Sequence, residues 1–231
     1  VTHSFKAGNL ALKELSLTTS SGNLIGIMGG SGTGKTTLMN IMNGKIKPTS
    51  GNLKINGVDL HEDRKSLEGV IGHVSQSDLL VEELSVFENL FFSARLCMNG
   101  FSDSELAKRV VSTLKMLGLY EIRYLKVGSK LDKVISGGQR KRLNIALELI
   151  REPSILFVDE PTLGLSSRDF ENIMDLLKEL SLNGKLVFVV IHQPSSNIFK
   201  LFDRLLIMDK GGFPIYDGNP LNAIVHFKTY S

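Results

Sequence analysis

Cysteine is almost absent from this 231-residue sequence. Its single cysteine, Cys97, excludes a disulfide within the chain and a zinc site built from a cysteine cluster. This usage is typical of a reducing compartment, and we expect Cys97 to be a half-buried helix residue rather than a catalytic thiol. The five histidines are scattered, without a His-x-x-x-His pair, so a metal site made of side chains alone is not predicted.

Long hydrophobic runs and an excess of one charge are also missing. The longest apolar run, Leu186–Ile191, has the length of a strand and not the roughly 20 residues of a membrane-spanning helix. No signal peptide is recognisable and the first residue is Val1, so we expect a piece of a longer chain. A net charge of +3, with Arg140–Arg142 as the longest basic run, gives no reason to expect nucleic acid as a partner.

Three short apolar runs have the length and composition of buried parallel strands, at residues 23–28, 154–159 and 186–191. Each ends in polar residues: GGSGTGKTT after the first, DEPT after the second and HQPSS after the third. In an open α/β sheet, ligands bind beyond the carboxyl ends of the strands. We therefore expect these three segments to converge on one site.

Residues 84–117 change to helical periodicity, with Ser102 or Asp103 as the cap of a second helix that ends at Gly118. Another helix is expected after the sequence SGGQ. The sequence thus predicts one α/β domain over 1–231, with a core at 1–80 and 152–231 and a helical subdomain at 81–151 that ends in the helix after SGGQ. Hairpin signals near the N-terminus, including a turn at Asn56-Gly57, predict an antiparallel β layer.

The glycine-rich loop fits G-x-x-x-x-G-K-[ST], between a predicted strand and a predicted helix. Backbone N–H groups and the positive end of a helix hold phosphates in such a loop. Lys35 is expected to reach the β- and γ-phosphates of a nucleotide, and the Thr36 hydroxyl to ligate Mg²⁺. The predicted nucleotide-binding residues are Gly29, Gly30, Ser31, Gly32, Thr33, Gly34, Lys35, Thr36 and Thr37.

Asp159 and Glu160 follow the apolar residues ILFV. By analogy with other P-loop NTPases, we expect Asp159 to orient the Mg²⁺ shell. Glu160 is then placed to polarise a water in line with the γ-phosphate. The plainer alternative is an acidic pair on the surface at the end of a strand.

The SGGQ sequence, Ser136–Gln139, opens a predicted helix and offers a second place where backbone N–H groups can hold an anion. Taken alone, the same residues make an ordinary helix N-cap. If this turn and the glycine loop lie on separate lobes, one chain cannot close both on a single phosphate tail. Another molecule could then bring the second turn to the first.

The order of these segments resembles that of ATP-binding-cassette (ABC) ATPase domains. The glycine loop, Gln76 in HVSQSD, SGGQ, LFVDEP and His192 in VVIHQP follow one another as in that family, over essentially the whole chain. SGGQRKRLNIALELI, HQPSSNIFKLFDRLLIMDKGG and LSVFENLFFSA are similar to the G (eye-pigment and multidrug/sterol) subfamily, in which the ATPase domain precedes its membrane domain. The resemblance implies a P-loop NTPase core of the RecA-like type, with a mostly parallel sheet, that hydrolyses ATP with Mg²⁺.

The resemblance also implies roles for single residues. Phe5 would stack on adenine, for about 1–3 kcal/mol, unless it is a core aromatic of the antiparallel layer. Gln76 would contact Mg²⁺ or the attacking water and report to a membrane partner, and His192 would bond the γ-phosphate and align Glu160. A loop glutamine and a structural histidine are the respective alternatives. Ser136, Gly137, Gly138 and Gln139 would contact the ATP of a second cassette.

Ser166 departs from the family pattern. After Pro161-Thr162, ABC domains carry a loop that ends in Gly-Leu-Asp-Ser, and here the sequence is LGLSS. The aspartate normally helps to link the two sites of a dimer, whereas a serine hydroxyl can form hydrogen bonds but carries no charge. We expect Ser166 to affect this coupling more than it affects ATP binding.

The sequence thus predicts an ATPase of an ABC transporter at the cytoplasmic face of a membrane. Two cassettes, identical or paralogous, would enclose two ATP–Mg²⁺ head to tail and drive a transmembrane domain of the same longer chain. Two alternatives remain: an ATP-dependent conformational switch with little hydrolysis, and a soluble ABC ATPase without a role in transport. A small-molecule P-loop kinase is disfavoured, because it would need no SGGQ and the sequence shows no lid for an acceptor.

Overall fold

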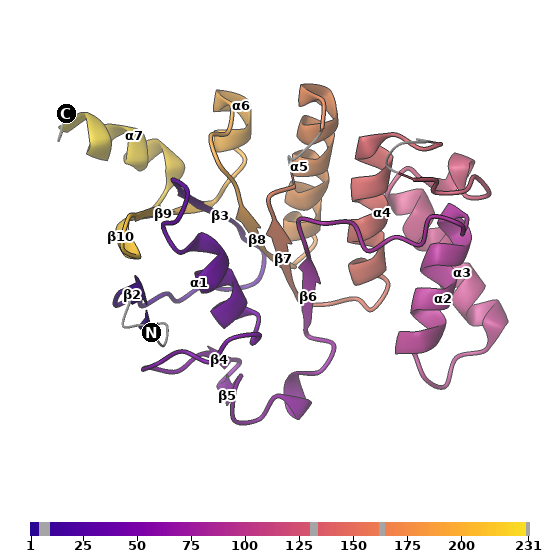
Figure 1. Cartoon of the computed structure of the whole chain (residues 1–231), viewed down its shortest axis with the longest axis horizontal. Coiled ribbons are helices and arrows are strands. Elements are labelled where there is room, and N and C mark those ends of the chain that lie inside the picture. The colour runs from indigo at the N-terminus through magenta and orange to yellow at the C-terminus, as the bar shows by residue number, and fades with distance from the viewer. Residues whose placement is uncertain (5–9, 130–133, 162–164, 230–231) are drawn as a thin grey trace.

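A six-stranded sheet runs through the centre of the computed structural model, which describes residues 1–4, 10–129, 134–161 and 165–229 (Figure 1). Its strands, in spatial order, are β10 (Phe213–Gly218), β9 (Arg204–Asp209), β3 (Leu24–Gly29), β8 (Leu186–Val190), β7 (Ile155–Asp159) and β6 (Ile71–Val74). All neighbours are parallel except β10 and β9. The three predicted buried strands are β3, β7 and β8, so that prediction is confirmed.

Two hydrophobic cores lie on the two faces of the sheet. Because side chains alternate along a strand, Phe157 and Phe188 enter one core while their neighbours on β7 and β8 enter the other. The first core is covered by α1 (Lys35–Met42), and its two phenylalanine rings stack with centroids 5.0 Å apart. The second is covered by α5 (Ser167–Leu182) and by the helices described next.

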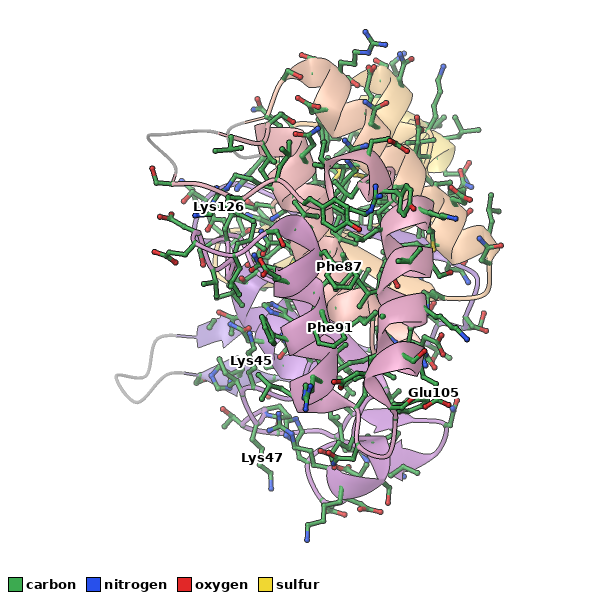
Figure 2. The ribbon with its side chains drawn as sticks, turned by 90° about the vertical axis from the view of Figure 1, so that its right-hand side faces the viewer. Lys45, Lys47, Phe87, Phe91, Glu105 and Lys126 are labelled. Carbon is green, nitrogen blue, oxygen red and sulfur yellow. The ribbon has the colours of Figure 1, made fainter. Side chains whose placement is uncertain are left out.

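Helices α2 (Val86–Cys97), α3 (Asp103–Met116) and α4 (Gly137–Leu149) lie at one end of the sheet, beyond β6 (Figure 1). Ser102 is the N-cap of α3, and Gly118, with a φ of 63°, lies just beyond its end. Figure 2 looks onto this end of the molecule, where Phe87 and Phe91 stack along α2 with centroids 5.7 Å apart. These helices fall inside the predicted helical segment, whose boundaries stay a prediction.

Cys97 is exposed, and the expectation of a half-buried cysteine is wrong. The buried stripe of α2 runs through Val86, Leu90 and Ala94, at intervals of four residues. The next residue in that series is Met98, which packs against the core, whereas Cys97 faces solvent one position earlier.

Short antiparallel pairs flank the sheet on its α1 side. They are β1 (His3–Ser4) with β2 (Leu10–Leu12), and β4 (Lys54–Ile55) with β5 (Val58–Asp59). Asn56 and Gly57 have φ values of 50° and 84°, as the predicted hairpin turn requires. The remaining elements are η1 (Lys65–Leu67), η2 (Tyr120–Ile122), α6 (Ser196–Phe199) and α7 (Pro220–Thr229).

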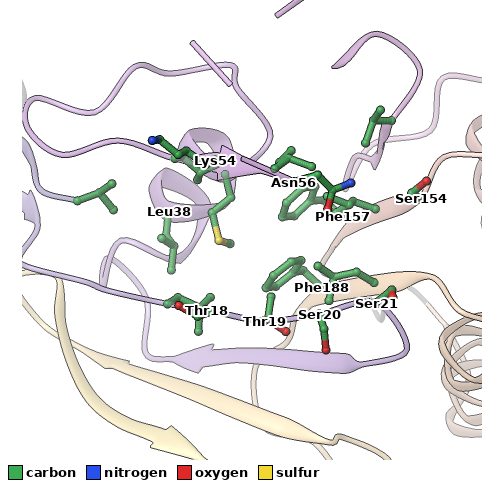
Figure 3. A pocket seen from close by; sticks show the side chains of 18 of the residues that line it. Thr18, Thr19, Ser20, Ser21, Leu38, Lys54, Asn56, Ser154, Phe157 and Phe188 are labelled. Carbon is green, nitrogen blue, oxygen red and sulfur yellow. The ribbon is translucent and has the colours of Figure 1, made fainter. Parts of the chain in front are cut away.

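A hollow of about 930 Å³ lies between residues 16–21 and 51–56, over Leu38, Phe157 and Phe188 (Figure 3). Ser154 and Leu186 also line it, so it lies at the amino ends of β7 and β8. Ligands of parallel sheets bind at the opposite, carboxyl ends. The hollow therefore lies at the end of the sheet opposite to the one where ligands bind. Among the described residues, no helix combines the length and hydrophobicity needed to cross a bilayer.

Replacing Phe157 by alanine should lower the free energy of unfolding by about 3–5 kcal/mol, because the ring is only 2% exposed and stacks on Phe188. Phe92→Ala is the matched control, since Phe92 is 45% exposed, and should cost less than about 1 kcal/mol. Urea denaturation of both variants measures the difference. Equal losses would show that the stacked pair does not anchor this core.

Candidate functional site

The loop between β3 and α1 leaves the start of α1 without a cap. Its N-cap, Gly34, has no side chain to offer, and the first turn contains no acidic residue. The N-caps of α2, α3, α4 and α5, by contrast, are Ser85, Ser102, Ser136 and Ser166, and each accepts a bond from its own helix. Uncapped N–H groups at the positive end of a helix dipole attract an anion. The start of α1 therefore has the features of an anion site.

Glycine is required at two positions of this loop. Gly29 has a φ of 151° and Gly34 a φ of 90°, which other residues rarely adopt. A Cβ atom on Gly29 would overlap the carbonyl oxygen of Met208, and one on Gly34 would overlap that of Ala11. The strands around the loop thus approach it so closely that only bare backbone fits.

Lys35 folds back across the same loop. It is 5% exposed, and its Nζ donates to the carbonyl oxygens of Gly29 at 3.0 Å and Gly30 at 2.6 Å. Burial lowers the pKa of Lys35, while the negative charges of Glu160 and then Asp159 oppose that shift. A cationic group is thereby held beside the uncapped helix start, where a phosphate would meet both.

Glu160 is held from both sides at the carboxyl ends of three adjacent strands. The amide nitrogen of Gln76, just after β6, donates to Glu160 Oε2 at 3.0 Å. His192 Nε2, just after β8, lies 2.6 Å from Glu160 Oε1. The chain turns at Glu160 itself, which has a φ of 41°. Two of the three predicted strand-end segments, those after β7 and β8, therefore meet directly, through Glu160 and His192. The third, the glycine loop after β3, is linked to them through the negative charges of Glu160 and Asp159, which act on Lys35.

Asp159, one residue earlier, carries a buried carboxylate oxygen, Oδ1, without a hydrogen-bond partner in the part of the chain described. Burial raises the pKa of Asp159, and the negative charge of Glu160 raises it further. A buried, unpaired carboxylate oxygen is a natural ligand for a hard cation. The donor set of Asp159, the exposed hydroxyl of Thr36 and the amide oxygen of Gln76 is chemically suited to Mg²⁺.

The SGGQ turn is a second helix start with free donors. Ser136 and Gln139 form a capping box, in which Ser136 N donates to Gln139 Oε1 at 2.7 Å and Gln139 N donates to Ser136 Oγ at 3.2 Å. The side chain of Gln139 is thereby used within α4. The hydroxyl hydrogen of exposed Ser136 and the N–H groups of Gly137 and Gly138 remain, with no acceptor in the described structure.

The glycine loop and the SGGQ turn lie apart in this chain. The glycine loop leads from β3 to α1, and α4 lies at the helical end of the molecule. Strands β8, β7 and β6 lie between β3 and that end (Figure 1). No hydrogen bond links Ser136–Gln139 to the glycine loop in the described residues. The remaining predicted contacts are placed only in part: Ser166 caps α5, and Phe5 lies outside the described residues.

Sequence reasoning missed a polar network that attaches α4 to the segment after Gln76. Arg140, 5% exposed, donates through Nε to Asp78 Oδ2 at 3.1 Å, and Asn144 donates to Asp78 Oδ1 at 2.6 Å. Lys141 Nζ donates to the Ser75 carbonyl at 3.0 Å. The available signal was the set of polar residues at positions 140, 141 and 144 in a helix that otherwise supplies the core.

Replacing Asp159 by asparagine should raise the melting temperature in buffer without Mg²⁺ and nucleotide. Both burial and the neighbouring Glu160 disfavour the ionised form of Asp159, and asparagine carries no charge. Asp175→Asn, on the exposed surface of α5, makes the same charge change and should leave the melting temperature nearly unchanged. A variant of Asp159 that melts below the wild type would contradict this account of the carboxylate.

Comparison with known proteins agrees with this arrangement. The family described as "ABC transporter" matches residues 12–163. A "Probable ATP-dependent permease" of Saccharomyces cerevisiae is 42% identical over 90% of this chain and 20% of its own length. "ABC transporter G family member 26" of Arabidopsis thaliana is 36% identical over 94% of this chain and 32% of its own.

A solved structure shares the fold as well. The ATP-binding cassette MJ0796, in a dimeric post-hydrolysis state bound to ADP and Pi, is 32% identical and superposes with a TM-score of 0.77, over 95% of this chain and 96% of its own. This chain spans about a fifth to a third of the length of the curated relatives named above. The family match covers more than half of the chain and the relatives cover nearly all of it, so the chain belongs to the ABC transporter family.

Proposed function

We propose that this chain binds and hydrolyses ATP and that a pair of such cassettes drives transport across a membrane. The observation that carries the proposal is the Glu160 carboxylate, which Gln76 and His192 hold at the strand ends, with its negative charge acting on buried Lys35. That arrangement combines a cradle for phosphates with an oriented base. Family membership supports the same activity.

The phosphates would lie against the N–H groups of the glycine loop and the first turn of α1. Lys35 would exchange its bonds to the Gly29 and Gly30 carbonyls for bonds to the β- and γ-phosphates. Gly29–Thr37 would supply the remaining contacts, and Phe5 the stacking surface for adenine. Thr36, Gln76 and Asp159 would hold Mg²⁺, whose chemical contribution is positive charge at the β- and γ-phosphates.

Hydrolysis would use a water positioned by Glu160 in line with the γ-phosphate. The carboxylate accepts a proton from that water as the new P–O bond forms and the bond to the leaving ADP breaks. His192, exposed at its strand end, would hold the carboxylate through one oxygen in the ATP-free chain and hydrogen-bond the γ-phosphate when ATP is bound. Gln76 would fix the other oxygen and contact Mg²⁺ or the water.

A second cassette would complete each site. Ser136 is exposed and Gly137 partly so, whereas Gly138 is buried at the same turn. Because three strands separate this turn from the glycine loop of its own chain, its donors would serve the nucleotide of another copy. Ser166 would lie near the seam between the copies. That the similar MJ0796 cassette is dimeric supports the pairing of two cassettes. The partner cassette could be an identical chain or a paralogue.

Transport itself is inferred from the relatives, each of which is several times longer than this chain. Their names describe a permease and a transporter, and we propose that this chain is likewise the part at the cytoplasmic face, with the transmembrane domain in the same longer chain. Closure of the pair on ATP and opening after hydrolysis would supply the motion.

Replacing Glu160 by glutamine should reduce ATPase turnover at least about a hundredfold, because the amide cannot take the proton of the attacking water. Turnover per wild-type chain should rise with protein concentration, because each site needs two chains. Phosphate release measured over a concentration series gives both results. Glu171→Gln, an exposed position on α5, should retain wild-type turnover.

The alternatives predict other results. A wild type as slow as Glu160→Gln at every concentration, yet able to dimerise with ATP, would favour a conformational switch with little hydrolysis. Transfer of phosphate to an added small-molecule acceptor would instead identify a kinase and reject the ATPase. Turnover that does not depend on concentration would reject the pairing.

A further inference from the structure

The carboxylate of Asp169 lies between the starts of α4 and α5. The hydroxyl of Ser166 donates to Asp169 Oδ2 at 2.7 Å, and the backbone N–H of Asp169 donates to Ser166 Oγ at 3.1 Å. Its Oδ1 lies against Gly138, where an added Cβ would overlap both that oxygen and the carboxyl carbon. One side chain therefore contacts both the residue that caps α5 and the turn that opens α4.

We propose that Asp169 is a positioning residue that opposes closure of the two cassettes and couples the SGGQ turn to Ser166. This inference rests on the proposed function, in which the γ-phosphate of a second chain reaches Ser136 and Gly138. In the open state, the negative charge of Asp169 stabilises the positive ends of two helices at once. When the phosphate arrives at the same turn, two negative groups meet there.

No Lys, Arg or His of the described residues forms an ion pair with this carboxylate. Asp169 is only partly exposed, so solvent screens it incompletely. The incoming phosphate thus pushes Asp169 away from Gly138. Because Asp169 also bonds Ser166, that push acts on Ser166.

The absence of a side chain on Gly138 keeps this contact short. Any Cβ there would force Asp169 and the start of α5 away from α4. The glycine therefore does more than expose its N–H to a phosphate: it allows the carboxylate of the neighbouring helix to lie on the same turn. The two helix starts consequently respond as one unit to the phosphate.

The test is ATP-dependent dimerisation in the Glu160→Gln background, where hydrolysis does not reopen the pair. Asp169→Asn removes the charge and keeps an oxygen that can accept the Ser166 hydroxyl. In low salt, the variant with Asp169→Asn should reach half-maximal dimerisation at an about tenfold lower protein concentration than its Glu160→Gln parent. Analytical ultracentrifugation measures both midpoints. Near 1 M salt the two midpoints should become nearly equal, because the electrostatic screening length falls to about 3 Å.

Asp175→Asn in the same background is the matched control, because it removes an equal charge from an exposed position of the same helix and should not shift the midpoint. Asp169→Thr removes the charge with a different side chain and should shift the midpoint in the same direction. With Glu160 intact, Asp169→Asn should lower both the ATP concentration at half-saturation and the maximal turnover, because closed pairs form more easily and open more slowly.

This role of Asp169 would be overturned if, in low salt, Asp169→Asn dimerised at the same protein concentration as its Glu160→Gln parent, or at a higher one. Either result would leave the proposed function intact. A shift of the same size at high salt would also overturn this role, since charge repulsion is screened. If the Glu160→Gln parent does not dimerise with ATP at all, the proposed pairing fails, and the inference fails with it.

Discussion

At the start of α1, backbone N–H groups point out of a helix that has neither a side-chain cap nor an acidic residue in its first turn. Five other helices in the described part of the chain place a serine at this position. Leaving α1 open forgoes the stabilisation that a side-chain cap would give in the absence of a ligand. Lys35 adds a buried cation to the same loop and bonds only its carbonyls. An arriving phosphate satisfies both deficits together.

The parallel sheet places the residues proposed for the reaction near the start of α1. Gln76, Glu160 and His192 each follow a strand, and the strands β6, β7 and β8 are neighbours. Their side chains lie close together, because parallel strands place their carboxyl ends at the same edge of the sheet. The left-handed backbone of Glu160 and the unpaired oxygen of Asp159 are local departures from relaxed structure at this edge. Such departures persist where surrounding structure enforces them, and they gather at functional sites.

Much of this arrangement could be predicted from the sequence, because it depends on local patterns. Apolar runs located β3, β7 and β8, and spacing located the glycine loop and the capped starts of α3 and α4. The contacts of Asp169 with Gly138 and of Arg140 with Asp78 could not be predicted in that way. They join residues 31 and 62 positions apart through the packing of whole elements, and residue types at those positions fit solvated helix faces equally well.

These unpredicted contacts give α4 a particular position in the molecule. Its Lys141 and Arg140 bond Ser75 and Asp78, on either side of Gln76 in the chain, and Gln76 bonds Glu160. Its first turn contacts Asp169, which bonds Ser166. A change at the carboxylate of Glu160 therefore has a continuous route of direct contacts to the SGGQ turn and onward to the start of α5. Contact alone does not establish coupling, which requires two arrangements that both ends can bias. The charge of Asp169 provides such a bias, because a phosphate and a carboxylate at the first turn of α4 repel each other.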